Sequence, residues 1–261
     1  MTEFFLAGDF PQATEADWLA LVEKALDGKP FGTLRTRLDE GFEIDPLYVP
    51  RGESPPLPLP RGWDVVQILS GDSASELTSL AEQAAGSGAN AFLIDFQAGL
   101  PFERAEELAP ILVPSAACYL ASGTSVAEAA LAVAAAEGRG SGALIGSAGL
   151  DPIARFALAS EVPAERALAC ADEVDAAFAL RDRAPRFIPF LAGDRAWHAG
   201  GASAVQELAF TLAAAVAYWR ALLAAGAPFA EAPGAIGFSL SATCDLFLTM
   251  AKFRAIRLLW A

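Results

Sequence analysis

Residues 193–213, which read GDRAWHAGGASAVQELAFTLA, decide the fold that we predict for this chain. The apolar run Arg186–Ala192 comes directly before them and predicts a strand. The single histidine of the chain, His198, and the pair Gly200-Gly201 follow in a polar turn. A set of apolar residues then recurs every three or four positions, as on one face of a helix: Val205, Leu208, Leu212, Val216, Trp219 and Leu223. Strand, polar loop and helix form a βα unit, and in barrels built of such units this loop handles ligands.

Apolar runs of the same kind alternate with helical segments over residues 61–261. The predicted strands are Trp63–Leu69, Ala91–Phe96, Ser115–Leu120, Ala143–Ser147, Arg186–Ala192 and Ala235–Leu240. Because these runs are continuously apolar, they indicate parallel strands covered on both faces. Capping boxes at Ser73 and Ser125 and a first-turn proline, Pro163, predict helix starts. The pattern predicts an α/β fold of the (βα)8 TIM-barrel type, incomplete, with about six βα units visible.

Residues 1–60 predict an N-terminal arm of helical and extended segments ahead of this partial barrel. A capping box at Thr14 opens a helix, and Asp27-Gly28 with Pro30 closes it. The segment Leu34–Val49 alternates polar and apolar residues around Glu40-Gly41, which predicts a hairpin. Residues 50–60 are proline-rich and predict an extended strap.

The last segment, Asp245–Ala261, predicts an amphipathic helix with a stripe of Leu246, Met250, Phe253, Ile256 and Trp260. We expect this stripe to be committed to packing. The segment has neither a C-cap nor a polar tail, so we expect a truncated chain or one that ends against another subunit.

Composition excludes several classes of partner. The chain of 261 residues has a net charge of -14, with 32 acidic against 18 basic residues. A nucleic-acid binder needs a basic face and an anionic membrane surface repels such a chain, so we expect neither partner. The longest uncharged run, Leu108–Ala127, contains two prolines and fits a strand and loop better than a membrane span. The cysteines Cys118, Cys170 and Cys244 show no metal-ligand spacing, and the N-terminus is a poor signal peptide. We therefore expect no metal site and a cytoplasmic location.

Five pieces of the sequence resemble one known family, in its order and roughly its spacing. They are DWLALVEKAL (17–26), GFEIDPLY (41–48), RGWDVVQ (61–67), AGGASAVQELAFTLAAAVAYWRAL (199–222) and AKFRAIRLLWA (251–261). The family is that of the adenosylcobalamin-dependent acyl-CoA mutases, the methylmalonyl-CoA mutase group. The resemblance covers nearly the whole chain, and its two C-terminal pieces are the specific ones.

Within this family, the chain resembles the non-catalytic small (beta) subunits of heterodimeric mutases. The tyrosine-containing motif of catalytic chains is replaced by the proline-rich strap, and their QND element by residues 147–151, SAGLD. Ala196 stands at the position of the histidine that hydrogen-bonds the thioester carbonyl in catalytic chains. The cobalamin domain with its DxHxxG motif is missing, and His198 is placed elsewhere. The resemblance implies a subunit, without catalytic residues of its own, that stabilises a catalytic mutase partner. Adenosylcobalamin is then held in the assembled complex and not by this chain alone.

Several residues are candidates for contact with an acyl-CoA ligand at the strand ends: Arg61, Trp63, Gln67, Asp194, Arg195 and His198. The alternative interpretation is that the same residues have a structural role, as a polar rim that braces the barrel mouth. Asp95 and Asp151 also lie near strand ends, where a pair of carboxylates performs acid–base work in other barrels. Two alternatives to the small-subunit prediction stay open. One is an active acyl-CoA mutase module that borrows cobalamin from a separate chain, and the other is an unrelated barrel enzyme. Whether the chain forms a heterodimer or a homodimer is also open.

Overall fold

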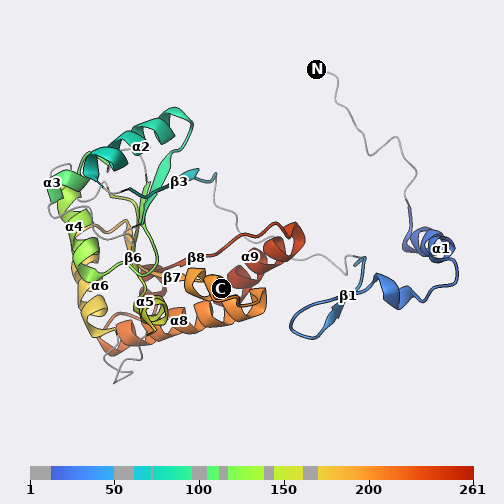
Figure 1. Cartoon of the computed structure of the whole chain (residues 1–261). Helices are drawn as coiled ribbons and strands as arrows, with labels where there is room; N and C mark the ends of the chain where they lie inside the picture. Colours follow the sequence, from blue (N-terminus) through green and yellow to red (C-terminus); the bar gives the residue numbers. More distant parts are fainter. Residues whose placement is uncertain are drawn as a thin grey trace, which may run out of the picture. The chain divides into compact units, whose positions relative to one another are not determined.

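The computed structural model divides the chain into two compact units, Met1–Pro60 and Arg61–Ala261, each described by itself. The structure describes residues 13–49, 62–71, 73–95, 105–111, 117–137, 144–160 and 170–261. The proline-rich strap, Arg61 and Pro163 lie outside the described residues. Figure 1 traces the elements along the chain.

The first unit contains the predicted helix and hairpin. Helix α1 spans Glu15–Leu26, and Thr14 and Asp17 cap its start reciprocally, so that capping box is confirmed. A 3-10 turn, η2 (Phe31–Leu34), leads into strand β1 (Thr36–Arg37), which pairs antiparallel with β2 (Glu43–Ile44). None of the described residues of this unit is buried. Its apolar side chains therefore form no core of their own.

The second unit is a six-stranded parallel sheet whose strands neighbour one another in sequence order. The strands are β3 (Val66–Leu69), β4 (Ala91–Ile94), β5 (Ala117–Leu120), β6 (Gly146–Leu150), β7 (Phe187–Gly193) and β8 (Ile236–Ser239). The connecting elements are α2 (Ala74–Gly86), α3 (Ala105–Leu108), α4 (Val126–Glu137), α5 (Pro152–Ala159), α6 (Ala171–Arg183), α7 (Arg195–Ala199), α8 (Ala204–Ala224), η4 (Ala232–Ala235) and α9 (Leu246–Trp260). Figure 1 shows the sheet curled inside an outer layer of helices. This is the architecture of a partial TIM barrel.

The strands and the inner faces of the helices share one hydrophobic core. Its largest fully buried side chains include Leu69, Ile94, Leu120, Leu150, Phe187 and Phe190, which come from five of the six strands. Burial of each such side chain contributes about 1.5–3 kcal/mol. The continuous apolar runs of β4 to β7 are thus explained by strands that are packed on both faces. In β3 three of the four residues are exposed, so the prediction of a strand covered on both faces is wrong there.

Strand β6 lies three residues later than the sequence predicts, over Gly146–Leu150 instead of Ala143–Ser147. Gly146 has φ of 129° and Gly149 has φ of 69°, so the strand departs from a regular β conformation. A side chain at either glycine would collide with the backbone of β5: a Cβ on Gly146 would lie 1.8 Å from the Cys118 carbonyl oxygen. The two glycines let β6 approach β5 closely, and they move the predicted SAGLD loop into the sheet.

Helix α8 faces the core with a different stripe from the predicted one. Val205 is exposed, and Leu212, Val216, Trp219 and Leu223 are half-buried. The buried face consists of Leu208, Thr211, Ala214, Ala215, Tyr218 and Leu222. Small residues in the middle of this face let the helix lie close to the sheet, where the ring of Tyr218 stacks on Phe190 at 4.8 Å. Periodicity located the helix correctly, but the fit of alanines against the strands decided its rotation.

By length and composition alone, α8 is the one helix in the described part of the chain that could cross a membrane. It packs instead against β7 and against α9. Its first turn also buries a carboxylate, that of Glu207. These are features of the core helix of a globular barrel.

We predict that Gly146→Ala destabilises the chain far more than Gly234→Ala. The first substitution adds overpacking against Cys118 and strain at a positive φ, which together cost at least about 3 kcal/mol. A Cβ on Gly234 meets nothing within 4 Å, so its substitution is expected to change the free energy of unfolding by less than about 0.5 kcal/mol. Urea unfolding followed by circular dichroism measures both. Equal stabilities of the two variants would show that β6 does not need its glycine.

Candidate functional site at the barrel mouth

The loops that follow the carboxyl ends of the strands meet at one end of the sheet, which we call the mouth. They contribute Asp95 after β4, residues 121–125 after β5, Asp151 after β6, residues 194–198 after β7 and Ser241 after β8. In complete barrels this is the end at which ligands bind. The mouth therefore contains the residues that decide whether this chain does chemistry.

Asp151 is a buried hub of hydrogen bonds. It accepts from the Ser122 hydroxyl at 2.6 Å, from the Gly193 N–H at 2.8 Å and from the Ala154 N–H at 3.1 Å. The hydroxyl of Tyr218 also donates to it. Burial raises the pKa of Asp151, and the hydrogen bonds from these donors oppose that rise. The carboxylate thereby ties the β5 loop, the end of β7 and α8 to the start of α5.

Lys252 is the centre of a second buried network. Its ammonium group donates to Asp194 at 2.7 Å and to Glu207, and all three side chains are at most 5% exposed. Burial opposes the charge on Lys252, but hydrogen bonds to the two carboxylates outweigh it and raise the pKa of Lys252. Asp194 also accepts from the backbone N–H and the hydroxyl of Ser241. The network joins the β7 and β8 loops to α8 and α9.

His198 is attached to the same network. Its Nδ1 lies 2.6 Å from Oε1 of Glu207, on the first turn of α8. This acidic partner could not be recognised from the sequence, because Glu207 looks like an ordinary first-turn glutamate. Lys252 was missed as well, although a lysine as the one charged residue of the segment Leu246–Phe253 is a signal of a buried charge pair.

The guanidinium of Arg195 lies 2.8 Å from the carboxylate of Asp95 and thereby joins the loops after β7 and β4. The Arg195 side chain is half-exposed, so the pair contributes no more than about 1 kcal/mol. Ala196 follows on α7 and is half-buried, with a methyl group that donates no hydrogen bond.

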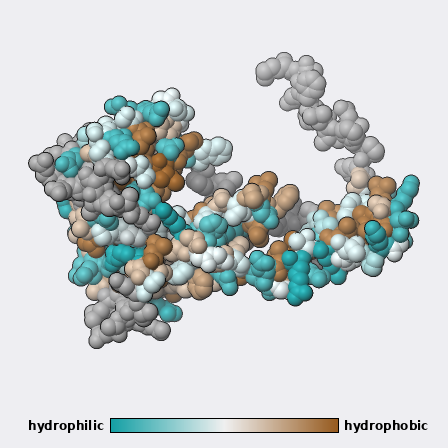
Figure 2. All heavy atoms as spheres, in the orientation of Figure 1, coloured by the Kyte–Doolittle hydropathy of each residue, from teal (hydrophilic) through white to brown (hydrophobic). Residues whose placement is uncertain are grey.

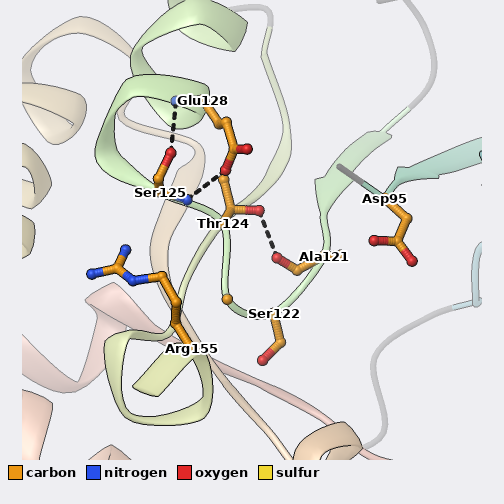
Figure 3. Close-up of a pocket in the computed structure, with 8 residues that line it drawn as sticks. Asp95, Ala121, Ser122, Thr124, Ser125, Glu128 and Arg155 are labelled. Carbon is orange, nitrogen blue, oxygen red and sulfur yellow. Dashed lines mark hydrogen bonds between the residues drawn. The ribbon is translucent and has the colours of Figure 1, made fainter. Parts of the chain in front are cut away.

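A pocket of about 180 Å³ opens at the mouth beside the β5 loop. Figure 3 shows its lining residues: Asp95, Ala121, Ser122, Gly123, Thr124, Ser125, Glu128 and Arg155. Their polar groups already have partners within the protein. Thr124 donates to the Ala121 carbonyl, Ser125 and Glu128 cap α4 reciprocally, and Arg155 lies 2.6 Å from Glu173. The pocket is smaller than the roughly 300–1,000 Å³ of typical ligand sites, and it does not fit a corrinoid.

The structure brings together some of the sequence-predicted residues and not others. Asp194 and His198 belong to the Lys252 network, and Arg195 pairs with Asp95 beside it. Trp63 lies just before β3, and Gln67 lies within it. Strand β3 is the first strand in the sheet order, at the opposite edge of the sheet from β8, and Trp63 is 86% exposed.

The thiols at the core are poor nucleophiles. Burial raises the pKa of Cys118 to about 12 and that of Cys170 to about 11, so both stay protonated at neutral pH. Cys244 is exposed in the loop before α9. Among the described residues, no three His, Cys, Asp or Glu side chains are grouped to hold a metal ion.

We predict that Lys252→Met lowers the free energy of unfolding by about 3–5 kcal/mol at pH 7, because it leaves two buried carboxylates without a counter-charge. A matched control is Arg254→Met on the exposed face of the same helix, expected to change stability by less than about 0.5 kcal/mol. Thermal and urea unfolding measure both, and a loss below about 1 kcal/mol for Lys252→Met would contradict the network.

The same network predicts an alkaline limit. Because the pKa of Lys252 is raised in the folded state above 10.5, its contribution is complete below pH 10.5 and is lost as the pH rises through the folded value. Burial of Cys118 and Cys170 raises their pKa values and adds an alkaline loss of its own, so unfolding measured between pH 8 and 12 is expected to show a smaller loss for the Lys252→Met variant than for the wild-type chain.

Comparison with known proteins agrees with this architecture. The sequence model of the family described as "Methylmalonyl-CoA mutase" matches residues 115–261. The chain is 32% identical to the methylmalonyl-CoA mutase small subunit of Streptomyces virginiae, over 98% of this chain and 46% of the relative. It is also 32% identical to the methylmalonyl-CoA mutase small subunit of Propionibacterium freudenreichii subsp. shermanii, over 100% of this chain and 45% of that relative.

A methylmalonyl-CoA mutase of Rhizobium meliloti is 47% identical, but only over 60 residues, which are 23% of this chain. The near-complete matches are thus to small subunits, as the sequence pieces indicated. The chain spans about half the length of these curated small subunits. With its partial TIM barrel and with more than half of its residues matched by the family model, the chain belongs to the methylmalonyl-CoA mutase family.

Proposed function

We propose that this chain is a non-catalytic, small-subunit-like component of a methylmalonyl-CoA mutase-type isomerase and that it stabilises a catalytic partner chain. The observation that carries the proposal is that the central polar groups of the mouth are buried and hydrogen-bonded within the protein. Asp151, Asp194, Glu207 and Lys252 are bonded to one another or to neighbouring elements and are buried. A general acid or base needs a reachable proton and a free partner on the substrate, and these groups offer neither.

Ala196 supports the same conclusion. In the catalytic relatives that the sequence resembles, a histidine at this position hydrogen-bonds the thioester carbonyl. The loss of one such donor costs on the order of 10²–10³ in rate. An active acyl-CoA mutase module with cobalamin supplied by a separate chain, which is the alternative, needs a replacement donor near Ala196.

The cofactor and the location follow from the proposal. Adenosylcobalamin performs the radical chemistry of such isomerases, and the partner chain would hold it, because the mouth pocket of about 180 Å³ is too small for a corrinoid. The exposed Cys244 is compatible with a reducing cytoplasm. The partner would be a catalytic mutase subunit in a heterodimer, with a homodimer as the competing assembly.

The first unit supplies a surface for that partner. A groove of about 490 Å³ is lined by Leu19, Val22, Glu23, Leu26, Gly28, Lys29 and Phe31. Trp18 packs edge-on against Phe31 at 6.2 Å and shapes the same region. Because no described residue of this unit is buried, its apolar groove gains most by burial against another chain.

Co-expression with the catalytic mutase chain from the same source, with only one chain tagged, tests the function. We expect a stoichiometric complex whose mutase activity changes less than about twofold when Arg195→Ala is introduced. The Arg195–Asp95 pair is half-exposed, so its loss leaves the fold intact. Arg186→Ala, at the opposite end of β7, is the matched control. The absence of a complex, or an activity loss of 10²-fold specific to Arg195→Ala, would favour the active module.

The arm gives a separate prediction. Leu19→Asp places a charge in the groove of the first unit and is expected to weaken the complex at least tenfold, measured by titration of labelled partner. Leu21→Asp changes a more exposed leucine of the same helix that does not line the groove, and we expect little effect. Equal weakening by the two variants would count against the groove as the contact surface.

A further inference from the structure

The pocket beside the β5 loop has walls that carry charges of both signs. Its lining includes the guanidinium of Arg155 in α5, the carboxylate of Glu128 in α4 and that of Asp95, which directly follows β4. Figure 3 shows Arg155 and Asp95 on opposite sides of the view. The exposed hydrophobic atoms that Figure 2 shows gather elsewhere, next to α2 and β3 and along α9. The pocket therefore offers a cationic and an anionic wall to a molecule that enters it.

Arg155 is held in position by a buried carboxylate. Its Nη2 lies 2.6 Å from Oε1 of Glu173, whose side chain is 5% exposed, whereas that of Arg155 is 36% exposed. A guanidinium has five N–H donors, and this ion pair uses one of them. Among the described residues, the guanidinium has no second hydrogen-bond acceptor. Arg155 thus keeps donors for a carboxylate, which a planar guanidinium binds in a bidentate manner.

Glu128 and Ser125 also keep unused hydrogen-bonding capacity. Oε2 of Glu128 accepts from the Ser125 N–H at 2.6 Å, and the Ser125 hydroxyl oxygen accepts from the Glu128 N–H at 3.3 Å. Within the part of the chain that the structure describes, Oε1 of Glu128 and the Ser125 hydroxyl proton have no further partner. The carboxylate oxygen can accept from an ammonium group, and the hydroxyl can donate to a carboxylate. Asp95, paired with Arg195, adds a second carboxylate to the anionic wall.

The size and the charges of the pocket together restrict its ligand. An apolar cavity of about 150 Å³ holds benzene, so the 180 Å³ of this pocket fits a ligand of about six to eight non-hydrogen atoms. A simple carboxylate of this size is repelled by Glu128 and Asp95, and a simple amine is repelled by Arg155. A molecule that carries both charges finds a complementary wall for each of them.

We propose that this pocket binds a small zwitterionic amino acid of the size of alanine or serine. The ligand carboxylate accepts from the Arg155 guanidinium and the Ser125 hydroxyl, and its ammonium group donates to Glu128, near Asp95. The small lining residues Ala121 and Gly123 leave room for a short side chain. Such a ligand requires no catalytic group, so the site goes beyond the proposed function and holds whether or not the chain is catalytic.

Isothermal titration of the whole chain with L-alanine and L-serine tests this site. Propionate and n-propylamine serve as comparison ligands that carry one charge each. We expect saturable one-to-one binding of the amino acids and at least about tenfold weaker binding of propionate and n-propylamine, because each lacks one charged hydrogen-bonding group. L-tryptophan is too large for the pocket and is expected not to bind.

Two substitutions change one wall each. Arg155→Lys keeps a positive charge beside Glu173 but loses the planar fork, and we expect it to weaken binding of L-alanine by at least about tenfold. Glu128→Gln keeps an oxygen that accepts from the Ser125 N–H and removes a negative charge. It is expected to weaken binding of L-alanine by at least about tenfold and to strengthen that of propionate. A merely structural role of Glu128 would not reverse the effect between the two ligands.

Two control variants keep the test specific. Arg181→Lys changes an arginine that lies outside the pocket, 3.1 Å from Glu231, and Glu82→Gln changes an exposed glutamate of α2. Both are expected to bind L-alanine like the wild type, and circular dichroism of each variant shows that it is folded. The proposal is overturned if the amino acids give no saturable heat, if propionate binds as tightly as L-alanine, or if Arg181→Lys weakens binding as much as Arg155→Lys. These titrations use this chain alone, so their failure is distinguishable from a failure to form a complex with a catalytic partner.

Discussion

The carboxylate of Asp151 is the constraint on which the barrel mouth depends. It accepts hydrogen bonds from the β5 loop, from the last residue of β7 and from α8, and it caps α5. A charge buried this deeply is tolerated only when several donors replace its water. The requirement fixes its surroundings closely: a Cβ on Gly193 would lie 2.4 Å from the Ser122 hydroxyl, so only glycine fits at the end of β7.

The Lys252 network extends the same principle to the next two loops. It places two carboxylates and one ammonium group under α8 and α9, and His198 attaches from α7. The residues of both networks include positions that follow the carboxyl ends of the strands, where a barrel enzyme has its reactive groups. In this chain the side chains at these positions hold the loops together. The non-catalytic role that we propose rests on this use of the mouth for structure.

Much of the fold could be predicted from the sequence, because hydrophobic period and capping chemistry are local. The order of strands, the hairpin after α1 and the helix starts at Thr14 and Ser125 follow from a few neighbouring residues. The rotation of α8 and the position of β6 could not, because they depend on small residues meeting a facing backbone. The candidate site was only partly predictable. His198 and Asp194 were identifiable as polar residues at a strand end, but their partners Glu207 and Lys252 are 9 and 58 residues away.

The central claim is that the buried polar groups of the mouth, Asp151, Asp194, Glu207 and Lys252, are bonded within the protein, and from this we propose that the mouth binds no thioester. Isothermal titration of the isolated chain with methylmalonyl-CoA tests this claim most directly, with free coenzyme A as the comparison. We expect no saturable heat with either compound at concentrations up to about 1 mM, the weak end of the range of KM values of enzymes. Saturable one-to-one binding of the thioester, lost on Arg195→Ala, would contradict it.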